Sequence, residues 1–130
     1  MDWSKIKYFT PDEFRCKYSH EVHMDESFVM AIDELRRRYG KPLRITSGFR
    51  HRTKHPIEAR KRTVGAHTTG KACDIGVSRG DAHHLLHLAC EMGCFTGIGI
   101  QQKGGGRFLH LDMATTRDLK GTWRPNIWSY

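Results

Sequence analysis

Four side chains in the second half of the chain are of the types that build hydrolytic metal sites: His67, Asp74, His110 and Asp112. His67, Asp74 and His110 together offer two imidazole nitrogens and one carboxylate oxygen. That set suits a single catalytic zinc ion, which keeps a fourth position for water. Zinc lowers the pKa of such a water to about 7 and thereby supplies hydroxide at neutral pH. A carboxylate must then accept the proton, and Asp112, two residues after His110, is the candidate.

Other histidines and the cysteines have plainer explanations than metal binding. The chain has nine histidines and four cysteines. Three of the histidines fall on one predicted helix, where exposure to solvent is the expected state: His83, His84 and His87. Cys90 and Cys94 have helical i, i+4 spacing and could share a metal, but there is no CxxC pair, and free thiols are the default expectation.

Two predicted strands must position these side chains. In residues 72–77 the apolar side chains alternate with polar ones, and Asp74 points to the polar side. In residues 108–113 the same alternation places His110 and Asp112 together on the polar side. If the two strands are neighbours in a sheet, Asp74, His110 and Asp112 form one surface, and His67 can fold back over it across a short Gly-containing turn.

The rest of the chain predicts a small α+β domain, with an antiparallel sheet flanked by helices. Thr10 to Glu13 has the pattern of a capping box and predicts a short helix to about Cys16. The remaining predicted elements are a helix over 25–39 ended by Gly40, a strand over 43–46, a loop over 50–65, a strand over 72–77, a helix opening at 78–81, a strand over 97–100 and a strand over 108–113. The aromatic tail, residues 123–130, is expected to pack back on the domain.

Length, hydropathy and charge limit the classes of protein. A chain of 130 residues and 15.0 kDa predicts one domain over residues 1–130. The mean hydropathy of −0.62 and the lack of a long apolar stretch predict no membrane insertion. The N-terminus lacks the features of a signal peptide, which predicts synthesis in the cytoplasm without export by that route.

The positive charge is concentrated in one stretch. The formal net charge is +8, and residues 36–62 hold eleven lysines and arginines against a single acid, Glu58. Such a stretch fits a polyanionic partner, although a solvated basic loop is an equally good explanation. Because no DNA-binding motif accompanies the stretch, nucleic acid is not the expected partner.

Three motifs resemble one known family. Ser47–Arg50 reads SGFR, Gly65–Asp74 reads GAHTTGKACD, and Phe108–Asp112 reads FLHLD. These strings resemble the zinc D-Ala-D-Ala carboxypeptidases and L-alanyl-D-glutamate endopeptidases of peptidase family M15, whose pattern is SGxR, then SxHxxGxAxD, then a late histidine. The resemblance extends from about residue 8 to residue 128. It implies the small α+β fold that these peptidases share with the hedgehog signalling domain.

The resemblance also implies roles for individual residues. It makes His67, Asp74 and His110 the zinc ligands and Arg50 the arginine that binds a substrate carboxylate or polarises the scissile carbonyl. Ser47, in the same motif, is then a substrate-binding residue.

Two positions depart from the pattern. Gly65 replaces a serine, so a hydroxyl contact is lost. Arg107 stands where many members have the catalytic acid three residues before the last histidine. The proton acceptor is then expected to be Asp112, as in the branch that has HxD.

The function that follows is a zinc-dependent peptidase that cleaves the stem peptides of peptidoglycan, as a D,D-carboxypeptidase or an L-Ala-D-Glu endopeptidase. Zinc and Arg50 would stabilise the oxyanion while Asp112 carries the proton. A monomeric phage lysin is expected, which reaches the cell wall after holin-dependent release or as part of a virion. Two alternatives stay open: a non-catalytic, zinc-stabilised cell-wall-binding domain, and a basic nucleic-acid-binding protein.

Overall fold

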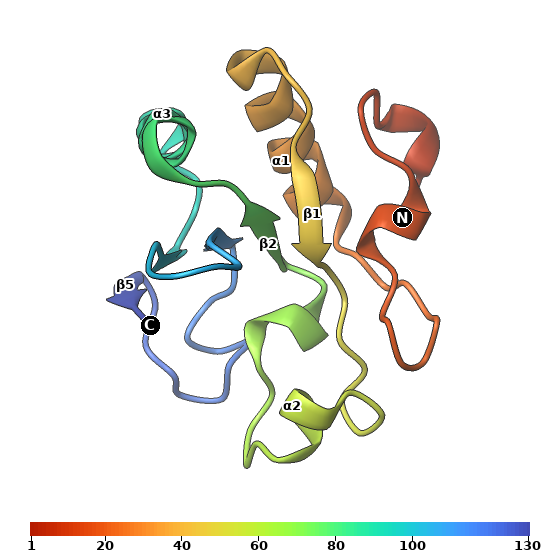
Figure 1. Ribbon diagram of the computed structural model, residues 1–130. Helices are drawn as coiled ribbons and strands as arrows, with labels where there is room; N and C mark the ends of the chain where they lie inside the picture. The colour runs from red at the N-terminus through yellow and green to blue at the C-terminus, as the bar shows by residue number, and fades with distance from the viewer.

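A five-stranded sheet forms the centre of the computed structural model, which describes residues 1–130 (Figure 1). The strands are β1 (Arg44–Ser47), β2 (Ala72–Gly76), β3 (Gly97–Gln101), β4 (Phe108–Asp112) and β5 (Asn126–Ser129). Their order across the sheet is β1-β2-β4-β3-β5. All neighbouring pairs are antiparallel except β3 and β5, which are parallel. The predicted α+β class is confirmed.

The aromatic tail does more than pack back on the domain, because it supplies β5. β4 ends at Asp112, which pairs with Gly97 at the start of β3. The chain then returns to the same end of the sheet, where Asn126 also pairs with Gly97. β5 therefore starts where β3 starts and runs in the same direction, so that the sheet is mixed at one edge.

Two long helices cover one face of the sheet. The helices are α1 (Glu26–Tyr39), α2 (Pro56–Ala59) and α3 (Arg79–Met92), with 3-10 turns η1 (Trp3–Lys5), η2 (Pro11–Phe14) and η3 (Ala66–Thr69). The Asp25 side chain caps α1 by accepting from the backbone N–H of Phe28, and Gly40 ends the helix with φ of 81°. None of the helices has both the length and the apolar character needed to cross a bilayer.

Two details differ from the predicted elements. The capping box of Thr10 and Glu13 is present, but it begins a 3-10 turn that ends at Phe14 rather than a helix that reaches Cys16. The chain becomes extended at Arg15, and a second turn, closed by the bond from the Cys16 N–H to the Glu21 carbonyl, follows at once. In the predicted loop over 50–65, the short helix α2 begins at Pro56, a favoured first helical residue.

The two faces of the sheet have opposite characters. The apolar face joins α1 and α3 in one core, to which β2 and β4 contribute Cys73, Ile75, Leu109 and Leu111. On the other face, Asp74 of β2 lies directly across from His110 of β4. The alternation predicted for both strands is confirmed, and their pairing brings the polar side chains together.

Candidate metal centre and active site

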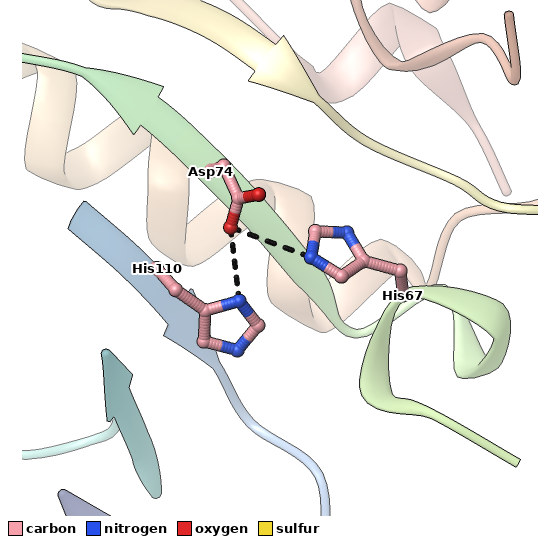
Figure 2. A group of neighbouring side chains, drawn as sticks. All are labelled: His67, Asp74 and His110. Carbon is pink, nitrogen blue, oxygen red and sulfur yellow. Dashed lines mark hydrogen bonds and ion pairs between the residues drawn. The ribbon is translucent and has the colours of Figure 1, made fainter. Parts of the chain in front are cut away.

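His67, Asp74 and His110 converge on one point above the polar face of the sheet. Candidate ligand atoms of the three residues lie within 4.8 Å of one another, and all three residues are buried. Asp74 Oδ1 is 3.0 Å from His110 Nδ1 and 3.4 Å from His67 Nε2. Figure 2 shows both imidazole rings turned toward one carboxylate oxygen, with Asp74 on β2, His110 on β4 and His67 on η3. The predicted ligand set is thus assembled in space.

The outer nitrogen of each ring has a partner that fixes its proton. His67 Nδ1 is 2.8 Å from the carbonyl oxygen of Gly48, which can only accept, so this nitrogen carries the hydrogen. His110 Nε2 is 2.7 Å from Asp112 Oδ2 and donates to that carboxylate. The inner nitrogens, Nε2 of His67 and Nδ1 of His110, then present lone pairs. Such outer hydrogen bonds are the usual way in which proteins orient histidine ligands.

When both rings are neutral, Nε2 of His67, Nδ1 of His110 and the Asp74 carboxylate are three acceptors that face one another, and a cation between them would satisfy all three. Burial lowers the pKa of His67, which favours the neutral ring that a metal needs. Burial opposes a charge on His110 as well, but the carboxylates of Asp112 and Asp74 outweigh it and raise the pKa of His110. The cluster therefore attracts positive charge, and two imidazoles with one carboxylate fit zinc.

Asp112 lies behind His110, on the side away from the converging ligand atoms. Its carboxylate is fully buried and accepts from Arg124 Nε at 3.1 Å, Arg124 Nη2 at 2.8 Å and the Ala114 backbone N–H at 3.1 Å. Burial opposes its ionisation, but hydrogen bonds from His110 and Arg124 lower the pKa of Asp112 to about 2. Gly97 leaves room for this carboxylate, because a side chain there would collide with it. This geometry is that of a group that orients His110.

Arg50 is held in the middle of the site by three partners. Its Nε donates to Ser47 Oγ at 3.0 Å, its Nη1 lies 3.3 Å from Glu58 Oε2, and its Nη2 lies 3.3 Å from Asp74 Oδ2. Only 14% of the surface of the Arg50 side chain is exposed to solvent. The structure thus places Arg50 beside a predicted metal ligand, while the Ser47 hydroxyl contacts Arg50.

Gly48 is needed for this arrangement because the chain passes very close to η2. A side chain at Gly48 would lie 2.5 Å from Phe14 Cα, and the next N–H, of Phe49, donates to the Phe14 carbonyl at 2.8 Å. With the chain held this close to η2, the Gly48 carbonyl faces His67, and Arg50 follows two residues later. The missing side chain at Gly48 thus makes room for the backbone of η2.

Two cavities meet at Arg50. The larger has a volume of about 760 Å³, and its wall includes the three clustered residues with Arg50, Lys61, Arg62, Arg124, Trp128 and Tyr130. The other has a volume of about 520 Å³ and lies toward η2 and β1. Both are lined by Arg50, Asp74 and Phe108. Each volume is within the ~300–1,000 Å³ range of pockets that hold a drug-sized ligand.

Several residues of the site escaped the sequence analysis. Glu58 and Arg124 each pair with a predicted site residue, and Trp128 packs against His110 with ring centroids 5.1 Å apart. Of these three residues, only Glu58 stands out in the sequence, because it is the single acidic residue in the basic stretch of residues 36–62. The sequence predicts only that the last residues pack on the domain, yet Trp128 and Tyr130 line the cavity next to the cluster of His67, Asp74 and His110.

The histidines of α3 and the two cysteines at its C-terminal end are apart from the site. The helical histidines, His83, His84 and His87, are exposed on α3, as predicted. Cys90 is exposed and Cys94 is half-buried, and both are free thiols. No group of three or more potential metal ligands forms other than His67, Asp74 and His110.

The comparison with protein families gives a match to the model described as Peptidase M15, over residues 7–112. The comparisons with curated proteins and with solved structures found no match. The matched region contains η2, the Ser47–Arg50 turn, η3 and the sheet up to the end of β4, and with them every residue of the cluster. The chain therefore belongs to the peptidase M15 family.

Proposed function

We propose that this peptidase is zinc-dependent and hydrolyses the stem peptides of peptidoglycan. The observation that carries the proposal is the cluster of His67, Asp74 and His110, in which both rings have their outer protons fixed and their lone pairs turned inward. Membership of the M15 family supports peptidase activity. A buried metal site at the wall of a cavity with an arginine beside it suits hydrolysis of an amide better than a purely structural metal.

Each residue around the cluster has a definite part in this proposal. His67 Nε2, an Asp74 oxygen and His110 Nδ1 would hold the zinc. Zinc, when bound, supplies a Lewis acid and a water that is nucleophilic at neutral pH. Arg50 has N–H groups beyond those paired in the structure, and these can bind the oxygen on which negative charge develops. Asp112 keeps His110 in the ligating tautomer. Arg124, which donates to the Asp112 carboxylate, in turn holds that carboxylate in place.

The charge around the site supports an anionic substrate. Lys61 and Arg62 line the larger cavity, and Arg15 and Lys17 line the smaller one. Stem peptides carry free carboxylates, and a positive surface raises the local concentration of such a polymer. We propose that the protein acts as a phage lysin, either a D,D-carboxypeptidase or an L-Ala-D-Glu endopeptidase, that reaches the wall through a holin or on a virion.

The test is mass spectrometry of muropeptides after incubation of purified peptidoglycan with the zinc-loaded protein. We expect new peptide products, none of which form with the Asp74→Ala variant or after chelation of the metal. The identity of the new ends reports which bond is cut. Intact muropeptides in all samples would reject the peptidase proposal.

A second candidate is a zinc-stabilised domain that binds the wall without cleaving it. It is favoured by one observation: the carboxylates of Asp112 and Glu58 both lie in ion pairs, and Arg107 occupies the position expected for an acid. Sedimentation of the protein with peptidoglycan, without any released peptide, would establish this alternative.

A further inference from the structure

Glu58 is a charged side chain that is completely buried next to the active site. It lies on the short helix α2 and has no exposed surface. A buried carboxylate must be paired, because an unpaired one would lose its hydration without compensation. Three groups surround it: Lys61 Nζ at 3.0 Å, Arg50 Nη1 at 3.3 Å and Thr68 Oγ1 at 3.3 Å. Burial opposes its ionisation, yet Lys61 and Arg50 outweigh burial and lower the pKa of Glu58.

Through these contacts Glu58 completes the fixation of Arg50. The guanidinium of Arg50 is bound on one side by Asp74 and on the other by Glu58, while Ser47 accepts from Nε. A planar guanidinium with a partner at each of its three nitrogens has one orientation. Removal of Glu58 would free Nη1 and leave only contacts with Ser47 and Asp74. Of the three side chains that bind the Arg50 guanidinium, Glu58 is thus the one that belongs neither to the predicted ligand set nor to the SGFR motif.

Glu58 also accounts for the departure at Gly65. A Cβ at Gly65 would lie 2.5 Å from Glu58 Oε1 and 2.7 Å from Lys61 Nζ. The backbone of Gly65 has φ of −86°, which any residue adopts, so the glycine is favoured here by the space that the Glu58 and Lys61 side chains occupy and not by conformation. The carboxylate of Glu58 therefore occupies the place of the side chain that the family pattern puts at this position.

A third contact ties Glu58 to the element that carries a metal ligand. Thr68, which follows His67 on η3, donates to the backbone carbonyl of Arg50 at 2.8 Å and lies next to Glu58 Oε1. One carboxylate on α2 thus contacts both the loop that carries Arg50 and the turn that carries His67.

We propose that Glu58 is a positioning residue, which holds the guanidinium of Arg50 in the orientation required for the reaction. The proposal deepens the proposed function, since Arg50 acts on the substrate and Glu58 acts through Arg50. The alternative is that the ion pairs of Glu58 only hold α2 in place and do not affect the orientation of Arg50.

The kinetic test is a double-mutant cycle with Glu58→Gln, Arg50→Ala and the combination of both. Glutamine preserves the shape of the side chain and removes its charge. We expect Glu58→Gln to lower kcat about 10–100-fold, the usual cost of losing an orienting partner, with unchanged zinc content. In the Arg50→Ala background the same substitution should cost nothing further. An unchanged kcat in Glu58→Gln, or an equal loss in both backgrounds, would overturn the proposal.

A spectroscopic test does not depend on turnover and so remains decisive even if the protein cleaves no muropeptide. The Nη hydrogens of a fixed guanidinium give separate proton resonances, which merge when the group rotates. We expect separate signals for Arg50 in the wild type and merged signals in Glu58→Gln. The matched control is Glu34→Gln, which removes an exposed Glu–Arg pairing on α1 and should leave the Arg50 signals unchanged. Separate Arg50 signals that persist in Glu58→Gln would show that Glu58 does not position Arg50.

Discussion

The two faces of the central sheet use the same strands for different tasks. On β2, Ile75 faces the core formed with α1 and α3, and its neighbour Asp74 faces the candidate ligands His67 and His110. Both residues are buried, Ile75 completely and Asp74 with 6% of its surface exposed. The apolar face is stabilised by removing hydrocarbon from water, at roughly 25 cal/mol per Å². The polar face gains little in this way, because buried polar groups cost free energy unless they are paired.

The pairing on the polar face is complete. No buried side-chain nitrogen or oxygen in the structure lacks a hydrogen-bond partner. The carboxylate of Asp112, for example, accepts hydrogen bonds from three groups: His110, Arg124 and the backbone N–H of Ala114. Because the two faces are stabilised differently, substitutions on them should separate into two classes. Changes on the apolar face should alter the free energy of unfolding, whereas changes on the polar face should alter metal binding and turnover.

The largest effect is expected from the ligands. His67→Ala, Asp74→Ala and His110→Ala should each abolish the binding of one zinc per chain, because each removes one of three donors, and turnover should be lost with it. His87→Ala, on the exposed face of α3, is the control and should bind zinc normally. Elemental analysis of the purified variants checks the stoichiometry. Full zinc content in all three ligand variants would show that the metal lies elsewhere.

A loss of about 10²–10³-fold in kcat is expected for Arg50→Ala, the usual cost of removing one group that stabilises an oxyanion. The comparison is Arg52→Ala, since the Arg52 guanidinium donates to backbone carbonyls of Glu58 and Lys61 rather than to the site. Steady-state kinetics on muropeptides should show a much smaller loss for Arg52→Ala. Equal losses in the two variants would assign Arg50 to loop structure.

For Asp112→Asn we expect zinc affinity to fall about 10–100-fold, since the substitution weakens the partner that orients His110. At saturating zinc, turnover should stay near that of the wild type. Zinc titration combined with kcat at full occupancy measures both quantities. A fall of about 10²–10⁴-fold in kcat at full occupancy would instead identify Asp112 as the proton acceptor that the sequence analysis favoured.

The smallest effect is expected on the apolar face. Ile75→Val removes one buried methylene group and should lower the free energy of unfolding by about 0.5–1.5 kcal/mol. Zinc content and kcat should be unchanged, although Ile75 directly follows a predicted ligand. Urea unfolding and metal analysis check the two statements. A loss of zinc in Ile75→Val would show that the two faces are not independent.

Much of this architecture could be predicted from local sequence. The caps of α1, the alternation in β2 and β4 and the exposure of the histidines on α3 all follow from interactions within a few residues. β5 could not be predicted in this way, because its strand forms only by pairing with the distant β3. The pairing of Arg50 with Glu58 and of Asp112 with Arg124 was also out of reach, since these partners lie 8 and 12 residues apart with turns and loops between them.

Local alternation establishes which residue types share a strand face, and the motifs indicate which of them are candidate metal ligands. The folded chain sets which ring nitrogens face inward, because that depends on Gly48 and Asp112 as partners of the outer nitrogens. It also decided that Asp112 lies behind His110 and that Glu58 is buried against Arg50. The physical reason is that alternation and capping are set by neighbouring residues, whereas the direction of a hydrogen bond in a buried site is set by groups that only the folded chain brings together.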